Sequence, residues 1–478
     1  MASWGDSLDK GVPRRTFLGG ATIAGAGVLA AACGMEAGPS GDGEEMAKDD
    51  APAKQDTKAP ASEGAVAVLL WQWSEGSYGP GFNALVGEFN EIQDEVDLTV
   101  EAPSGYWDKL LAGLAAQTGP DVFLMNGVNI KSWITGGRVA ADLSQYVSAD
   151  PQATDDLAAA LPSFVDWYST DGKASGTPWN YSTSNTQYNV DHVVAAGLTP
   201  PAELGDGWDW NAYQEYAEKL TQRDGENITR FGSGQVHGIE TGWGNFVQMS
   251  GGSVLSEDRS RCVINTPEAI EGVQFCVDMI QKHRVAPTRD EYTALRGENK
   301  IHPAFFLTQG LVSIHSAGDW YFGRYLDDPA LNWDVTFLAK SPKTGQTGNN
   351  SNFRGTVMNA ASNNPDAAWK WMAHSITKSV QDRIVEHFNE VPGRLDSAIE
   401  FYTSTEAAGP PPSRAMLEDS LRATIALPTH DVVTWVQMIR EAINPNMNPI
   451  FDGEITVAEG LKQLEDQLNA IIDEAGSG

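Results

Sequence analysis

Tryptophans and hydrogen-bonding side chains recur together along this chain, where loops follow strand-like segments. The aromatic members are Trp71 or Trp73, Trp179, Trp243 and Trp320, and the polar neighbours are Gln72, Ser74, Asn126, Asn180, Ser182, Asn245, Asp319 and Arg354. An aromatic face stacks on a flat C–H surface, while amides and hydroxyls bind a rim of hydroxyl groups. The combination suits a sugar-like ligand. For three further tryptophans, Trp333, Trp369 and Trp371, we predict core positions.

Arg354 raises a separate question about the charge of the ligand. A guanidinium can form two parallel hydrogen bonds to a carboxylate or phosphate, which would indicate an anionic ligand such as a uronate or a sugar phosphate. It can equally bind sugar hydroxyls or pair with Asp319. One arginine in so acidic a chain does not decide between these alternatives.

Catalytic and cofactor motifs are missing from the sequence. A glycosidase would place two carboxyls about 5 or 6.5 to 9.5 Å apart across the scissile bond, and the acids here stand in no glycosidase context that we recognise. The chain has no G-x-S-x-G, H-E-x-x-H or C-x-x-C motif, and its glycine-rich turns lack a phosphate-loop lysine. We therefore expect a binding protein with no enzymatic activity, cofactor or metal. The alternatives are a secreted glycosidase, or a binder of a sugar phosphate, peptide or iron.

Alternating strands and helices must position these residues. Residues 65–71, 96–100 and 121–125 are apolar runs of strand length, and helical patterns fill the intervals, one from 79 to about 89 and one over 106–116. Strands separated by helices of this length imply βαβ units and a parallel sheet. Ligands of such sheets bind beyond the carboxyl ends of the strands. Residues 71–74 and 126–127 lie at those ends.

A similar alternation returns later in the chain. Helical patterns cover about 211–220, 267–280 and 457–474, and another begins near Pro365, while 231–234 and 311–314 have the character of strand or turn. No repeat of solenoid period is present. The predicted fold class is therefore α/β.

The N-terminal segment has the parts of an export signal. Arg14-Arg15 precedes the uncharged run 17–32, which ends at Cys33. The pattern resembles a twin-arginine signal ending in a bacterial lipobox, which implies lipidation of Cys33. The alternative, a retained membrane anchor, is disfavoured because the run is shorter than the ~20 residues of a bilayer span. Residues 34–64 are poor in apolar side chains, which predicts a disordered acidic linker.

Charge and cysteine content narrow the remaining classes. With 64 acidic against 32 basic residues, the chain carries a formal net charge of -32, so nucleic-acid phosphates would be repelled. The chain beyond the linker exceeds what one core organises, which predicts two or more domains. Cys262 and Cys276 are the only cysteines after Cys33. In an exported protein they either form a disulfide or remain two buried thiols.

Six short stretches occur in an order that resembles one family, the extracellular solute-binding proteins of ABC importers. The resemblance is to the sugar-binding group that includes the maltose- and glycerol-phosphate-binding proteins. The stretches are Gly119-Pro120-Asp121-Val122; Gly176-Thr177-Pro178 followed by Tyr188-Asn189-Val190-Asp191; Trp208 to Leu220; Ile264-Asn265-Thr266-Pro267-Glu268-Ala269; Phe306 to Trp320; and Asn364-Pro365-Asp366-Ala367-Ala368-Trp369.

This resemblance implies a two-lobed periplasmic-binding-protein-like fold of type II, with the ligand in a cleft that closes by hinge motion. We expect a signal peptide over 1–32, the lipidated linker over 33–64, an N-terminal lobe of 65–181 plus 355–402, and a C-terminal lobe of 182–354 plus 403–478. The implied partners are a carbohydrate, the permease of an ABC importer and, through Cys33, the outer face of the cytoplasmic membrane. We expect a monomer.

The family's cleft positions fall on residues 180–183 and on Trp320. Ser182 stands where the maltose-binding protein carries a carboxylate, which argues against a maltose-like ligand. The complete predicted ligand-binding set is Trp73, Ser74, Asn126, Trp179, Asn180, Tyr181, Ser182, Trp243, Asn245, Asp319, Trp320 and Arg354.

Overall fold

The computed structural model describes residues 64–73, 78–134, 139–161, 164, 167–170, 172–298, 301–325, 328–404, 411–421 and 425–476. The predicted signal peptide, Cys33, the linker up to residue 63 and Ser74 lie outside these ranges. Within them, no helix combines the length and the apolar character needed to cross a membrane.

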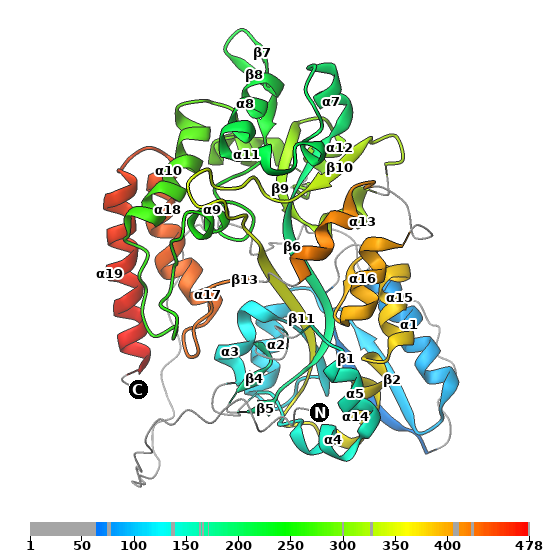
Figure 1. Ribbon diagram of the computed structural model, residues 1–478. Helices are drawn as coiled ribbons and strands as arrows, with labels where there is room; N and C mark the ends of the chain where they lie inside the picture. The colour runs from blue at the N-terminus through cyan, green and yellow to red at the C-terminus, as the bar shows by residue number, and fades with distance from the viewer. Residues whose placement is uncertain are drawn as a thin grey trace. The chain divides into compact units, whose positions relative to one another are not determined.

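The first part of the chain forms the predicted βαβ units. Strands β1 (Val66–Trp71), β2 (Val96–Glu101) and β3 (Val122–Asn126) alternate with α1 (Tyr78–Ile92) and α2 (Tyr106–Ala115). β1 lies between β2 and β3 and is parallel to both. Figure 1 shows β1 beside β2. The apolar face of α1, including Phe82, Leu85 and Phe89, is buried. The carboxyl ends of β1 and β3 therefore lie side by side.

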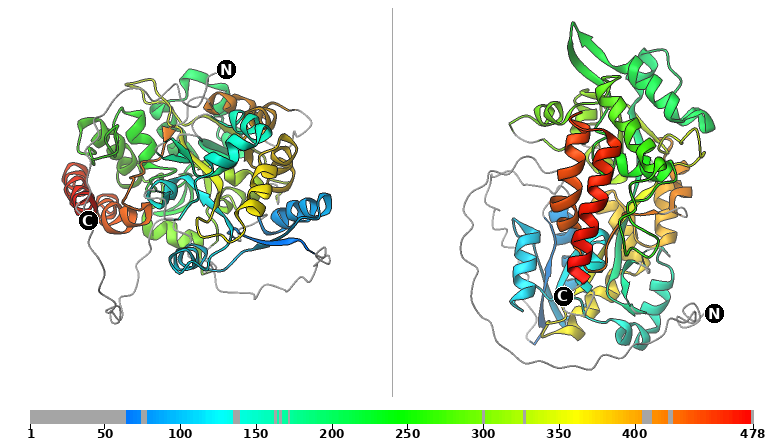
Figure 2. Two further views of the ribbon diagram at one scale, coloured as in Figure 1. Left: turned by 90° about the horizontal axis from the view of Figure 1, so that it is seen from below. Right: turned by 90° about the vertical axis from the view of Figure 1, so that its left-hand side faces the viewer.

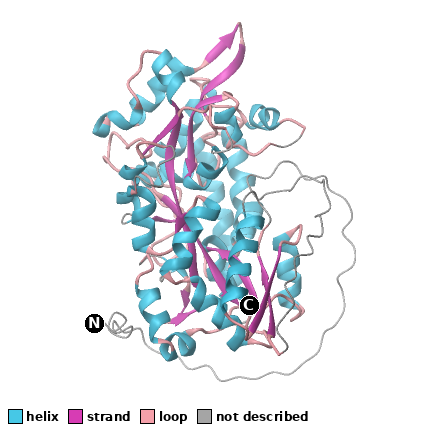
Figure 3. Ribbon diagram, turned by 90° about the vertical axis from the view of Figure 1, so that its right-hand side faces the viewer, coloured by secondary structure: helices cyan, strands magenta, loops and turns pink. Residues whose placement is uncertain are grey.

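The long strand β6 (Thr177–Asn189) is the centre of the sheet, and all thirteen of its residues are buried. Its first part pairs with β11 (Asn350–Met358) and β12 (Val391–Pro392), and its last part pairs with β9 (Val312–Gly318) and β10 (Trp333–Thr336). The main path of the sheet is β2-β1-β3-β11-β6-β9-β8-β7. The strands run between helices on either side (Figure 3). β6 thus joins the N-terminal βαβ units to the strands of the second half.

The later helices also match the predicted positions. They are α8 (Trp210–Leu220), α10 (Pro267–Gln281), α14 (Pro365–Ser375) and α19 (Val457–Gly476). The Thr266 side chain caps α10 by accepting a hydrogen bond from Ala269 N. α18 (Asn444–Phe451) packs beside α19, as the right-hand view of Figure 2 shows.

The other described α-helices and strands are each at most 11 residues long. They are α3 (Gly127–Ile134), α4 (Ser144–Ala149), α5 (Pro151–Ala158), β4 (Ser169–Thr170), β5 (Lys173–Ala174), α7 (Val190–Ala195), β7 (Gln222–Asp224), β8 (Asn227–Ser233), α9 (Trp243–Met249), α11 (Arg289–Arg296), α12 (Phe305–Thr308), α13 (Phe322–Tyr325), α15 (Lys378–Phe388), α16 (Leu395–Thr403), β13 (Ile425–Ala426) and α17 (Trp435–Gln437).

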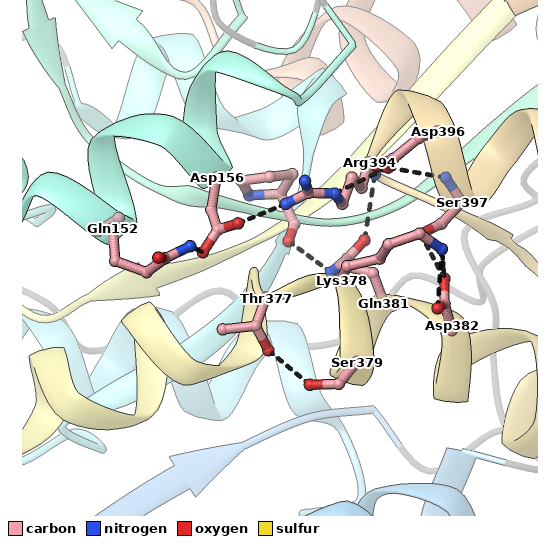
Figure 4. A network of polar contacts seen from close by, with 12 residues as sticks. Gln152, Asp156, Thr377, Lys378, Ser379, Gln381, Asp382, Arg394, Asp396 and Ser397 are labelled. Atoms are coloured by element: carbon pink, nitrogen blue, oxygen red, sulfur yellow. Dashed lines mark hydrogen bonds and ion pairs between the residues drawn. The ribbon is translucent and has the colours of Figure 1, made fainter.

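A buried polar network fastens helices α5, α15 and α16 to the start of β6 (Figure 4). Gln381, fully buried on α15, donates to Pro178 O at 3.3 Å and accepts from Arg394 N at 3.1 Å. The Arg394 guanidinium pairs with Asp156 of α5 and with Asp396 of α16. One arginine therefore joins three helices next to the central strand.

The structure shows the surroundings of the three predicted core tryptophans and of the two cysteines after Cys33. Trp333, Trp369 and Trp371 are at most 7% exposed, which confirms them as core residues. Cys262 and Cys276 are both buried free thiols, so the disulfide alternative is wrong for this structure. Burial raises the pKa of Cys262 to about 12, which leaves it a neutral thiol at physiological pH. The lobe boundaries stay a prediction, since β6 and β11 each continue through them.

Candidate ligand-binding site

Strand register brings several predicted site residues to one face of the sheet. Arg354 of β11 lies opposite Asn126 of β3 and opposite Asn180 of β6, and Asn352 lies opposite Ser182. Side chains of paired residues point to the same face, and alternate residues along a strand do so as well. Asn126, Asn180, Ser182, Asn352 and Arg354 therefore form one surface, which we call the polar face. Asn126, Asn352 and Arg354 remain partly exposed there.

Trp320 lies against the same face further along the sheet. A Cβ atom built on Gly318 would come within 1.6 Å of the Trp320 ring, so the ring covers the side on which that Cβ would project. Gly318 pairs with Ser184, whose side chain has the same orientation as Ser182. Glycine at 318 allows this close approach. The partly exposed indole of Trp320 thus flanks the polar face at one end.

An aromatic group flanks the polar face at the other end. Arg354 Cζ lies 5.5 Å from the ring centroid of Trp73, a cation–π contact. Trp107, at the start of α2, lies 5.6 Å from Trp73 between centroids and is partly exposed. Sequence reasoning missed Trp107, although its place directly after the second strand-to-helix loop was a usable signal.

Arg354 and Asn180 share a partner that the sequence did not suggest. Arg354 Nη1 donates to Glu390 Oε2 at 3.1 Å, and Asn180 Nδ2 donates to the same oxygen. The side chains of Arg354 and Glu390 are only 16% and 8% exposed. The structure therefore pairs Arg354 with Glu390. The sequence had suggested Asp319 as a possible partner. Glu390 precedes β12, a two-residue strand with no sequence signal of its own.

Asp319 lies below the polar face, at the start of the turn after β9. Its Oδ2 accepts from Tyr402 Oη at 2.8 Å and from Thr183 N at 3.2 Å. Burial raises the pKa of Asp319 to about 8, with a further upward contribution from Glu390, against the hydrogen bonds of Tyr402 and Thr183. The carboxyl is therefore protonated at neutral pH. Only 2% of Asp319 is exposed, so it supports the site from within.

Trp179 and Tyr181 point to the opposite face, where they are core residues. Trp179 is fully buried, with its ring stacked on Phe82 at 4.5 Å between centroids and an edge contact to Phe388. The Tyr181 ring packs 5.0 Å from Phe353, and its hydroxyl donates to Ser420 O at 3.2 Å. The prediction that these two side chains contact the ligand is therefore wrong. Successive residues of a strand point to opposite faces, so Trp179 and Tyr181 lie on the face opposite Asn180 and Ser182.

Trp243 and Asn245 belong to α9, and both are buried. Asn245 Oδ1 accepts from Asn350 N at 3.0 Å, and its Nδ2 donates to Glu240 O at 2.9 Å. Asn245 therefore holds the first residue of β11 in place. Its amide is used within the protein, so we correct its predicted role from ligand contact to support of β11, and Trp243 is likewise enclosed.

The assembled site offers two aromatic flanks, three amides, the Ser182 hydroxyl, and one guanidinium paired with a carboxylate. The carboxyls of Glu390 and Asp319 both accept hydrogen bonds from protein donors. These groups can stack on a ring and orient hydroxyls.

A model of the bacterial extracellular solute-binding proteins matches residues 84–409, more than half of the chain. The chain belongs to this family. An arabinooligosaccharide-binding protein of Halalkalibacterium halodurans is 22% identical to it over 283 residues, which are 56% of each chain. The chain therefore spans little more than half the length of this curated relative.

Solved structures of other proteins have the same fold as this chain. An ABC substrate-binding protein from Listeria monocytogenes in complex with cycloalternan superposes with a TM-score of 0.73 at 22% identity, covering 86% of this chain and 99% of the other. A solute-binding protein from Thermotoga lettingae bound with α-D-tagatose gives 0.71 at 19% identity, covering 85% and 100%. The two-lobed solute-binding fold predicted from the sequence is thereby confirmed.

Proposed function

We propose that this protein is the substrate-binding component of an ABC importer and captures a mono- or oligosaccharide outside the membrane. The observation that carries the proposal is the polar face between Trp320 and the Trp73–Trp107 pair. Amide groups there can bind sugar hydroxyls while the partly exposed indoles of Trp320 and Trp107 stack on C–H faces. The name of the arabinooligosaccharide-binding relative and the saccharides in the cycloalternan and tagatose complexes support this ligand class.

Delivery and location complete the proposal. The ligand would be held between the N-terminal lobe (65–181 plus 355–402) and the C-terminal lobe (182–354 plus 403–478), and lobe closure would present it to the permease. Export through the twin-arginine-like signal and lipidation at Cys33 would leave the protein anchored to the outer face of the cytoplasmic membrane as a monomer. It would have no catalytic role.

A thermal-shift panel tests the ligand class. We expect neutral saccharides, among them arabinose, mannose and glucose oligomers and tagatose, to raise the melting temperature, because a ligand that binds only the folded state stabilises it. Chromatography of the same mixtures should show each saccharide intact. A shift with amino acids, peptides or iron but with no saccharide would refute the proposal, and release of cleavage products would indicate a glycosidase.

A further inference from the structure

The positive charge on the polar face, that of Arg354, is paired with a carboxylate of the protein itself. Arg354 and Glu390 are 3.1 Å apart, and neither side chain is more than 16% exposed. A buried pair of this kind is weakly screened by salt. Arg354 Cζ also lies 5.5 Å from the centroid of the Trp73 ring. The Arg354 guanidinium therefore meets a ligand with its charge already paired to a carboxylate of the protein.

Glu390 also fixes the amide beside that pair. Because Asn180 Nδ2 donates to Glu390, the carbonyl oxygen Oδ1 of Asn180 is oriented away from it, and this buried oxygen has no hydrogen-bond partner within the described residues. A carboxylate or phosphate placed here would meet an acceptor oxygen and the negative charge of Glu390. A neutral hydroxyl group placed here carries no charge for Glu390 to repel. The arrangement thus disfavours anionic groups beside Glu390.

We propose that Glu390 is a specificity-determining residue, which neutralises Arg354 and so makes the polar face select uncharged saccharides over uronates and sugar phosphates. This inference rests on the proposed function. Replacing Glu390 by Gln would keep an acceptor for Asn180 and Arg354 but remove the negative charge, so the Arg354 guanidinium would attract a ligand carboxylate more strongly than in the wild type.

The test compares saccharides that differ only at C6. Calorimetric titrations would use galactose with galacturonate, mannose with mannuronate and glucose with glucuronate, as monomers and trimers, on the mature protein. For Glu390→Gln we expect the ratio of uronate to neutral affinity to rise by about tenfold or more over the wild type, since one new close charge pair is formed. In the double variant Arg354→Gln/Glu390→Gln this gain should disappear.

Asp396→Asn is the matched control. Asp396 also pairs with an arginine, Arg394, at 2.7 Å, and its loss changes the net charge by the same amount away from the polar face. The affinity ratio should stay at the wild-type value. Arg354→Gln should change the ratio of uronate to neutral affinity in the opposite direction, because Glu390 without the charge of Arg354 should disfavour uronates further. This variant remains informative if Glu390→Gln does not fold.

The outcomes separate the two proposals. A wild type that binds neutral saccharides while Glu390→Gln gains no preference for uronates, or gains no more than Asp396→Asn, overturns the role of Glu390 alone. A wild type that binds uronates as tightly as their neutral counterparts also overturns it. If the wild type binds no saccharide of the panel, both proposals fall.

Discussion

Trp320 and Trp179 lie on opposite faces of one sheet. Replacing Trp320 should therefore weaken ligand binding, whereas replacing Trp179 should weaken the fold. Trp179→Ala would empty a fully buried site against Phe82 and should lower the free energy of unfolding by about 3–5 kcal/mol. Trp320→Ala should weaken saccharide binding by about tenfold or more with a much smaller loss of stability. Urea unfolding and calorimetric titration of both variants measure this, and a binding defect confined to Trp179→Ala would contradict the assignment of faces.

Asp319 should make stability depend on pH between about 6.5 and 8. Its pKa rises from 3.8 to about 8 in the fold, so the protonated folded state is favoured and the free energy of unfolding falls as pH increases toward 8. Burial lowers the pKa of His302 to about 3 and of His315 to about 4, so these groups weaken the fold only as pH falls below 6.5. Urea unfolding at pH 6.5 and 8 should show this decline for the wild type and a flatter profile for Asp319→Asn. An equal decline in both proteins would assign it to another group.

Residue types in the sequence were enough to find the segment of the site but not the orientation of its side chains. Residues 179–182 were all predicted to contact ligand, yet alternation sends Trp179 and Tyr181 into the core. Deciding this required the register of β6 with β11, which lies some 170 residues later in the chain. Glu390 was unpredictable for the same reason, since only the folded sheet brings it to Arg354.

Strand and helix prediction succeeded where apolar residues form a continuous run of strand length or recur with the period of a helix. The elements β1 to β3, α1, α2, α8, α10 and α19 follow such patterns. β6 gave no such signal, because Asn, Ser, Thr and Gln fill much of a strand that is buried along its whole length. Hydrogen bonds replace apolar contacts there: Gln187 Nε2 donates to Gly318 O at 2.8 Å, and Tyr325 Oη donates to Gln187 Oε1 at 2.6 Å. Neighbouring strands therefore make this polar strand stable.

The attachment of helices α5, α15 and α16 should depend on one ion pair. Asp156→Ala would remove the carboxylate of α5 from Arg394, which keeps its pair with Asp396, and should lower the free energy of unfolding by about 1.5–3 kcal/mol. Asp466→Ala removes an exposed i,i+4 pair with Lys462 and should cost about 0–1 kcal/mol. Urea unfolding measures both variants. Equal losses would mean that the buried network in Figure 4 adds nothing beyond a surface pair.

For the molecule in the cell, Cys33 is the residue on which the proposed membrane anchoring depends. Cys33→Ala should shift the protein from the membrane fraction to the medium or the soluble extracytoplasmic fraction, because a lipid chain supplies the membrane affinity. Saccharide affinity should be unchanged, since the predicted linker separates Cys33 from the folded residues. Fractionation with immunoblotting and calorimetry of the purified variant measure the two properties. Unaltered membrane association would rule out this anchor.

Capture of a saccharide on the polar face is tested most directly by a crystal structure of the mature protein with a neutral saccharide from the thermal-shift panel. We expect the sugar ring to lie against Trp320, with its hydroxyls bonded to Asn126, Asn352 or Arg354, and Glu390 still paired with Arg354. A saccharide bound elsewhere, with the surface between Trp320 and Trp73 occupied only by water, would contradict the proposed site.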